Sequence, residues 1–267
     1  MNALNAPRRD EHGFTLAELL ITIAILGLVM AAVLGVQLTS STMFLRGENQ
    51  ADAQQAARAA LLMEEDLRMV RYGCPDLGCP TPPPAGAQQA ISVASTTSIT
   101  FWADTLNAST TLAAAVTAPA VSVPVVDASG ITVSDRIYVN NGSTWESTVV
   151  TGKAGNTLSV AALNNSFPQG AQVGRPRQIV YTFTAATGTL TKDAGDGNGA
   201  QTLATGITGL TFSFYDASDS LISPANPVAN PQSIRRILIQ TTTRSALASG
   251  GGASTFQINT NVRPRNL

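Results

Sequence analysis

The stretch GFTLAELL, from Gly13 to Leu20, decides how the rest of the chain is organised. Two arginines, Arg8 and Arg9, precede it, and no charged side chain occurs in the 27 residues from 19 to 45. At about 1.5 Å per helical residue this run spans roughly 40 Å, which is more than the ~30 Å hydrocarbon core of a bilayer. The acidic residue Glu18 stands near its start. A charge costs roughly 2.5–3.5 kcal/mol at the centre of a membrane helix, so a carboxylate in this place calls for a partner.

The junction of Gly13 and Phe14, followed by Glu18 and a long apolar helix, resembles the prepilin signal of type IV pilins and type II secretion pseudopilins. The resemblance implies that a membrane prepilin peptidase cuts between Gly13 and Phe14 and methylates the new amine of Phe14. It also implies that Glu18 pairs with the Phe14 amine of a neighbouring subunit. The physics agrees, because a buried carboxylate is tolerable when an ammonium neutralises it, and an ammonium at a helix N-terminus needs an anion.

Two simpler membrane segments share this hydropathy. A secretory signal peptide has an apolar segment of about 7–15 residues with its cleavage site behind it, whereas this run is longer and the candidate cut lies before it. A plain single-pass anchor does not require Glu18 at the fifth position of the cleaved chain. The pattern therefore favours the pilin-type signal, with the plain anchor as the alternative.

The composition is common in secreted, β-rich proteins and gives no support for a nucleic-acid groove. Charged residues make up 12% of the 267 residues and the net charge is −1, whereas globular proteins average about 25% charged residues. The only lysines are Lys153 and Lys192, so no lysine cluster indicates a nucleic-acid groove. The sole histidine, His12, leaves with the leader. A Ser-His-Asp triad is then excluded, and we expect no enzymatic activity.

We expect an α+β fold in which a long N-terminal helix, transmembrane and then amphipathic, packs on an antiparallel β-sheet head. Residues 1–13 form the expected leader, and the helix is predicted over residues 14–72, with its transmembrane part at about 16–38. Apolar residues at helical spacing form a stripe that should face the sheet: Ala56, Ala60, Met63, Leu67 and Val70.

Four further helix residues have two interpretations each. Leu61 and Leu62 fall off the stripe and are either filament contacts or residues at the edge of the core. Gly27 and Gly35 lie in the membrane half, where an interior glycine weakens a helix by roughly 0.5–1 kcal/mol. By the pilin resemblance they are candidate soft points at which the helix extends in a filament, and otherwise they allow close helix packing.

Short β-type runs separated by turn residues predict a head made of residues 73–104 and 176–267. Residues 105–175 read as an inserted small all-β subdomain, whose strands, one expected at 131–133, can close into a barrel or sandwich. The later runs, among them residues 179–183 and 206–215, resemble the carboxyl-terminal sheet of PilW-type minor pilins and J-type pseudopilins.

Cys74 and Cys79 occur in the segment CPDLGC, directly after the predicted helix. The leader and helix place this segment outside the cytoplasm, where disulfides persist. We expect a small looped disulfide that pins the end of the helix to the start of the head. A zinc site needs about four ligands, and a redox pair more typically has the spacing Cys-x-x-Cys.

A glycine-rich loop contains Asp193, Asp196 and Asn198, whose oxygens at short spacing make them calcium candidates. The EF-hand spacing is absent and a solvated hairpin turn uses the same residues, so we expect no cofactor, with calcium as the alternative. Trp102 is expected in the core of the head. Trp145, near an Asn-Asn-Gly turn, is a candidate for an adhesive contact.

These features predict a minor type IV pilin, a structural subunit that helps to initiate or cap a pilus serving adhesion, twitching motility or DNA uptake. The alternatives are a J-type pseudopilin at the tip of a type II secretion pseudopilus and a membrane-anchored extracytoplasmic binding module. The resemblance implies other pilin subunits, prepilin peptidase, the inner-membrane assembly platform and, before assembly, membrane lipid as partners; nucleic acid is not indicated. It places the chain in the bacterial inner membrane as a single-pass protein with its head outside the cytoplasm, and then in a pilus or pseudopilus.

Overall fold

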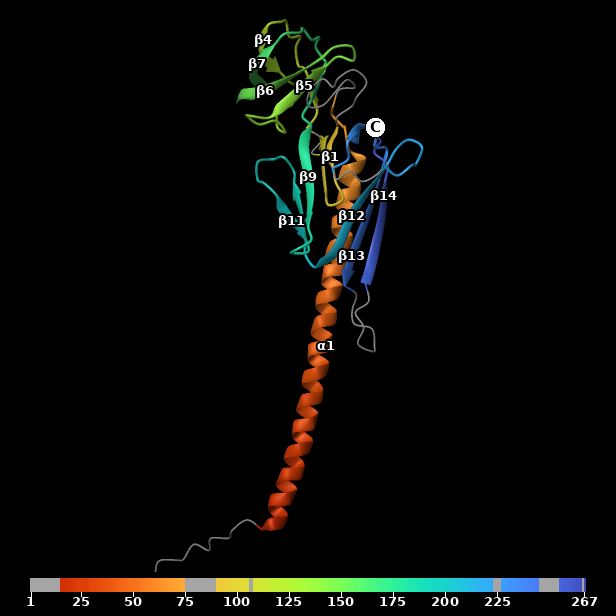
Figure 1. Cartoon of the computed structure of the whole chain (residues 1–267). Helices are drawn as coiled ribbons and strands as arrows, with labels where there is room; N and C mark the ends of the chain where they lie inside the picture. Colours follow the sequence, from red (N-terminus) through yellow and green to blue (C-terminus); the bar gives the residue numbers. More distant parts are fainter. Residues whose placement is uncertain (1–14, 75–89, 106–107, 223–226, 245–254, 266) are drawn as a thin grey trace, which may run out of the picture. The chain divides into compact units, whose positions relative to one another are not determined.

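The computed structural model describes residues 15–74, 90–105, 108–222, 227–244, 255–265 and 267. These residues form one long helix, three antiparallel sheets and a short 3-10 helix, η1, at Pro231–Ser233 (Figure 1). The expected α+β fold, with an apolar N-terminal helix and antiparallel sheets, is confirmed. The chain divides into two units, residues 1–48 and 49–267, which are described separately.

Helix α1 runs from Leu16 to Arg68. Its first 26 residues, Leu16–Ser41, have a mean hydropathy of 2.8 and are long and apolar enough to cross a membrane. The expected transmembrane part at 16–38 lies within this segment. At its other end the helix tightens, because the amide of Met69 bonds the carbonyl of Asp66 and the amide of Tyr72 bonds that of Met69, three residues back. Helical geometry therefore ends a little before the predicted residue 72.

Two antiparallel sheets form the head around the second half of α1. The first has the order β1-β2-β9-β10-β11, with β1 at Ile91–Ala94, β2 at Ser98–Ala103, β9 at Arg177–Thr184, β10 at Thr189–Asp193 and β11 at Gln201–Ala204. The second has the order β12-β13-β14, with β12 at Ile207–Tyr215, β13 at Arg236–Arg244 and β14 at Thr255–Val262. Figure 1 shows β12 and β13 alongside the part of α1 that belongs to this unit.

The predicted stripe, formed by four residues of α1 and by Val70 just beyond its end, is the helical side of the head core. All five of its residues are at most 2% exposed, and they pack with buried side chains of both sheets, including Phe101, Ile179, Phe212 and Ile239. Leu61, which falls off the stripe, is 66% exposed. The amide of Arg71 bonds the carbonyl of Trp102 at 2.8 Å, so the end of the helix is also tied to β2 through the backbone.

One polar cluster is buried where α1 meets the first sheet. Asp66 is 5% exposed and lies beside the stripe. The hydroxyl of Tyr181 donates a hydrogen bond to Asp66 Oδ2 at 2.5 Å, and Lys192 Nζ lies 2.5 Å from the same oxygen. Lys192 and Tyr181 are cross-strand neighbours on β10 and β9. The cluster therefore links the helix to two adjacent strands.

The segment between β2 and β9 forms a third sheet with a core of its own. Its order is β3-β8-β5-β6-β7-β4, with β3 at Thr110–Thr111, β4 at Ala120–Pro124, β5 at Arg136–Asn140, β6 at Trp145–Ala154, β7 at Thr157–Leu163 and β8 at Gln172–Gly174. A bridge between Leu112 and Val125 joins the two outer strands, so the sheet closes on itself as a small barrel. Buried aliphatic side chains and Phe167 fill it. Figure 1 shows β4, β5, β6 and β7 grouped beyond one end of β9.

The barrel leaves and rejoins the head at neighbouring positions. Ala103 at the end of β2 pairs with Arg177 at the start of β9, so the two ends of the insertion are cross-strand partners. Its strands lie between Thr110 and Gly174, inside the predicted limits of 105 and 175. Those limits, and the independence of the inserted part, stay predictions.

Candidate functional site

The residues at the predicted cleavage junction, Gly13 and Phe14, lie outside the described part of the chain. Thr15 is the first residue that the structure describes, and α1 begins directly after it. The predicted disulfide also falls partly outside the described residues, because Cys74 is described and Cys79 is not. Cleavage, methylation and the Cys74–Cys79 bridge therefore stay predictions.

Thr15 and Glu18 form a reciprocal cap at the start of α1. Glu18 Oε2 accepts hydrogen bonds from the amide and the hydroxyl of Thr15, each at 3.0 Å. In return, Thr15 Oγ1 accepts one from the amide of Glu18 at 3.3 Å. This is a capping box, in which a Thr just before the helix and a Glu three residues later satisfy each other's backbone donors. The signal Thr-x-x-Glu is visible in the sequence, but the only role predicted for Glu18 was its pairing with the Phe14 amine of a neighbouring subunit.

The cap uses one carboxylate oxygen of Glu18 and leaves the other available. All the hydrogen bonds of this side chain to described residues go to Oε2. Glu18 is exposed, so Oε1 can accept from a group outside the described chain. A helix N-terminus favours an anion in this position. The same carboxylate can therefore hold the start of its own helix and bind an ammonium on a neighbour.

The helix beyond Glu18 presents an exposed, apolar surface. Every residue from 16 to 41 is exposed, and most of the large side chains among them are leucine, isoleucine, valine or methionine. An apolar surface of this length is far larger than soluble monomers expose. It requires lipid or other apolar helices around it.

A shallow hollow on this helix coincides with one of the two glycines discussed above. Ala32, Gly35, Val36, Thr39, Ser40 and Met43 line it. Among the described residues, a Cβ placed on Gly27 or Gly35 would meet nothing within 4 Å. Contacts within the chain therefore explain neither glycine, and both interpretations, soft points and close packing against other helices, stay open.

The calcium candidates lie in a turn in which the aspartate carboxylates accept hydrogen bonds from backbone amides of the same turn. Asp193 Oδ1 accepts from the amide of Gly195 at 2.9 Å, and Asp196 Oδ1 accepts from the amide of Asn198 at 3.0 Å. The bonds from the backbone and side chain of Asn198 lower the pKa of Asp196 below its ordinary value. No group of three His, Cys, Asp or Glu that could hold a metal is found among the residues described. Calcium binding stays a prediction without further support.

The expectation that Trp102 lies in the core is wrong. Strand alternation buries its neighbour Phe101, which is 0% exposed, and leaves Trp102 half-buried on the opposite face of the first sheet. Trp145 is also half-buried, with its ring 6.0 Å from that of Tyr138. Burial raises the pKa of Tyr138 to about 12. An adhesive role for Trp145 is not tested by this arrangement.

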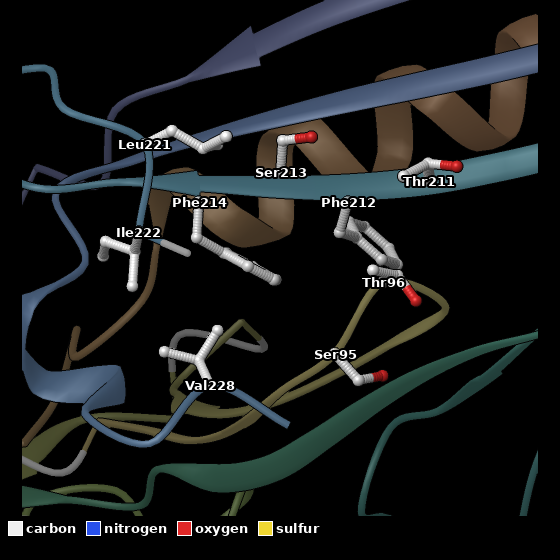
Figure 2. A pocket seen from close by; sticks show the side chains of 9 residues that line it. All are labelled: Ser95, Thr96, Thr211, Phe212, Ser213, Phe214, Leu221, Ile222 and Val228. Carbon is white, nitrogen blue, oxygen red and sulfur yellow. The ribbon is translucent and has the colours of Figure 1, made fainter. Parts of the chain in front are cut away.

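A cavity of about 140 Å³ opens between the two sheets of the head. Figure 2 shows Phe212 and Phe214 on the same side of β12, pointing towards Thr96, Ile222 and Val228. Its surface is mostly apolar, and the described residues that line it include no charged side chain. Its serine and threonine hydroxyls have no acid, histidine or amine beside them among the described lining residues that could act as a base.

Comparison with known families identifies the N-terminal segment. Residues 8–34 match the family model described as the prokaryotic N-terminal methylation motif. The match contains the candidate cleavage junction, the Thr15–Glu18 cap and the start of the apolar helix. No curated protein matches the chain.

Proposed function

We propose, from the premise that this chain is a type IV pilin-like precursor, that it is a minor pilin which helps to initiate or cap a filament. The observation that carries the proposal is the Thr15–Glu18 cap at the start of a bare apolar helix, inside the matched motif. An acid whose Oε1 has no hydrogen bond to a described residue fits the capture of a neighbour's N-terminal amine. A membrane anchor alone has no need of it.

The apolar surface of the helix explains how the subunit is stored in the membrane and then assembled into a filament. Before assembly, lipid covers the apolar surface from 16 to 41, with the head on the outer side of the inner membrane. Processing by prepilin peptidase exposes the amine of Phe14. During assembly the apolar faces of other pilin helices replace lipid, which is a nearly even exchange for apolar surface. The Glu18–ammonium pair then sets the axial register, because a misdocked subunit leaves a buried charge without a partner.

The barrel supports a minor rather than a major subunit. It adds a second core to a head that already has one around α1. A subunit in the body of a helical filament has neighbours on all sides, and each copy must accommodate the added volume. A subunit at the tip has fewer neighbours, so an enlarged head fits there.

The second candidate is a J-type pseudopilin of a type II secretion system. The methylation motif supports it equally, since pseudopilins carry the same signal. Deleting the pilus assembly ATPase or the secretion ATPase distinguishes the two, because the protein should leave the membrane fraction only when its own machine is present.

Substitutions of Glu18 and Thr15 test the proposal. Glu18→Gln removes the charge but keeps an oxygen that can cap the helix. Thr15→Ala removes the cap but keeps the charge. We expect Glu18→Gln and Glu18→Ala to abolish incorporation into sheared filaments, whereas Thr15→Ala retains most of it. Immunoblots of filament and membrane fractions measure this, and mass spectrometry of the N-terminus shows whether Phe14 is exposed and methylated in each variant.

The outcomes separate the three interpretations. Normal incorporation of Glu18→Gln would show that the carboxylate serves only its own helix, and the minor pilin proposal would fail. Equal losses for Thr15→Ala and Glu18→Gln would show that incorporation needs the cap as well as the charge, because each variant keeps what the other removes. Loss of filament incorporation with full membrane retention is the result that the plain anchor does not predict.

A further inference from the structure

A second cavity, of about 320 Å³, lies where the first sheet of the head meets the barrel. The sheet contributes Trp102, Arg177, Val180 and Asp193, and the barrel contributes Arg136. Trp102 and Val180 alternate along their strands with Phe101, Ile179 and Tyr181, which are buried under α1. The cavity is therefore on the face of the sheet that α1 does not cover, and it is separate from the assembly site.

Asp135, an acid that lines this cavity, already has hydrogen-bond partners within the chain. Asp135 Oδ2 accepts hydrogen bonds from the amide of Thr132 at 2.7 Å and from Arg175 Nη1 at 2.8 Å. Burial raises the pKa of Asp135, but the bonds from Arg175 and Thr132 outweigh it and hold the pKa below its ordinary value. The carboxylate is thus ionised and committed mainly to Arg175.

Two further guanidinium groups in the cavity are poorly satisfied. Arg177 Nη2 reaches Asp135 Oδ1 only at 3.4 Å, and its Nε is buried with no hydrogen-bond acceptor among the described residues. Arg136 is exposed, and its one hydrogen bond to a described residue is a long one, 3.3 Å to Ser147 Oγ. Buried polar groups in proteins normally have partners. A planar guanidinium matches a carboxylate in geometry and charge.

The rest of the lining suits a ring with hydroxyl groups. The half-buried indole of Trp102 gives an apolar face, and its N–H has no acceptor in the described part of the chain. Asp193 uses Oδ1 for the amide of Gly195, and Oδ2 is left to accept from a hydroxyl. Gly195 allows this edge of the cavity to lie close to β9, because a Cβ there would lie only 2.5 Å from the carbonyl oxygen of Gln178.

We propose that this cavity binds one acidic sugar unit, a pyranose ring that carries a single carboxylate. The ring stacks on Trp102, its carboxylate binds Arg136 and the Nη groups of Arg177, and a hydroxyl donates to Asp193. The volume is at the lower end of the range for ligand pockets, which suits one ring. Asp135 and Asp193 disfavour a phosphate dianion. A nucleic-acid strand needs a longer cationic groove with several stacking platforms.

The fluorescence of Trp102 provides the readout. Trp145→Phe leaves Trp102 as the only tryptophan of the full-length chain, which is studied in detergent micelles. We expect D-glucuronate or N-acetylneuraminate to change this fluorescence in a saturable way. D-Glucose lacks the carboxylate, acetate lacks the ring, and inorganic phosphate supplies only an anion, so these three should bind much more weakly.

Matched arginine substitutions test the proposed contact. In the Trp145→Phe background, Arg136→Gln should weaken glucuronate binding by about tenfold or more, a change of at least about 1.4 kcal/mol. Arg244→Gln, also at an exposed arginine but away from the cavity, should leave binding unchanged. Thermal unfolding should be the same in both variants, because Arg136 has little structural bonding.

Several results would overturn the proposal. One is the absence of saturable binding by either acidic sugar. Another is binding of acetate or phosphate as tight as that of glucuronate, which would indicate an anion site without ring recognition. Tighter binding of a short single-stranded DNA would indicate a different class of ligand. None of these results bears on Glu18 or filament assembly, so the two proposals fail independently.

Discussion

Asp66 illustrates what single residues contribute beyond the hydrophobic pattern. The sequence shows it next to the apolar stripe of α1 but gives no sign of its partners. Tyr181 and Lys192 become its neighbours only because β9 and β10 pair in one particular register. Burial, and then the negative charge of Asp66, raise the pKa of Tyr181 above its ordinary value. The cluster therefore holds a charged acid, a neutral phenol and an ammonium in one buried place.

Removing Asp66 should damage the head more than removing an exposed acid on the same turn. Asp66→Ala leaves Lys192 largely buried without its partner, and such losses cost about 3–5 kcal/mol. Glu65→Ala, at an exposed position, should change the free energy of unfolding by no more than about 0.5 kcal/mol. Urea unfolding of the full chain in micelles, followed by circular dichroism, measures both. Similar small effects would show that the cluster contributes little to stability.

The raised pKa of Tyr138 predicts a loss of stability at high pH. Its folded-state pKa is about 12, against 10.0 for an ordinary tyrosine, because burial disfavours its charged form. Between these two values the unfolded chain gives up a proton that the folded chain keeps, so stability is complete below pH 10.0 and falls as the pH rises towards 12. Tyr138→Phe should flatten this fall but not remove it, because the pKa of Tyr181 is raised too. Unfolding measured at a series of alkaline pH values tests the slope.

At the scale of elements, the sequence located most of the helix and the longer strands. The run at residues 206–215 corresponds to β12, and the run at 179–183 lies in β9, where Ile179, Tyr181 and Phe183 are all buried. Period-two and helical spacing are strong signals when an element has one buried face. Elements that lack such a pattern were missed, as in the two-residue strand β3 and the mostly exposed β11.

The strand expected at residues 131–133 was wrong for a physical reason. Ile131 is buried, as the pattern suggested, but its amide bonds the carbonyl of Ala128 in a turn. Asp135 then takes the amide and hydroxyl of Thr132. A turn that buries one large side chain resembles a short strand in sequence, and only its hydrogen bonds distinguish the two.

Two leucines of α1 separate the core function of the helix from its outer surface. Leu67 is 0% exposed in the core, so Leu67→Ala should lower the free energy of unfolding by about 2–5 kcal/mol. Leu61 is 66% exposed, so Leu61→Ala should leave stability nearly unchanged. Unfolding of both variants in micelles checks this. If Leu61→Ala also reduces filament incorporation, Leu61 is a filament contact; if it does not, the residue has no role beyond helix formation.

At the scale of the whole molecule, the barrel adds a second hydrophobic core to the head. Its core shares no residue with the core around α1, and its ends are the cross-strand partners Ala103 and Arg177. The sequence predicted the insertion from its density of short strands. It did not predict the cavity beside it, because Trp102, Arg136 and Asp193 come from segments that only the completed fold brings together. Glu18, in contrast, lies within one short motif.

Replacing residues 104–176 with the dipeptide Asn-Gly should leave a folded head. Asn-Gly is the preferred two-residue connection between antiparallel strands, and the pairing of Ala103 with Arg177 supplies its ends. We expect the shortened protein to keep its helical signal in circular dichroism, to be processed, and to enter filaments, while glucuronate binding is lost. A shortened protein that is degraded or that aggregates would show that the head depends on the barrel.

The closure of the barrel affects whether neighbouring heads associate through their strand edges. Sheet edges normally offer rows of free amides and carbonyls to any similar chain, and many proteins guard them with lysine or proline. Here the bridge between Leu112 and Val125 turns the outermost strands toward each other. A surface with so few charges has little electrostatic protection against sticking to its neighbours. Closing this edge protects the barrel against edge-to-edge association without the use of charge. Salt in the surroundings would therefore not weaken the protection.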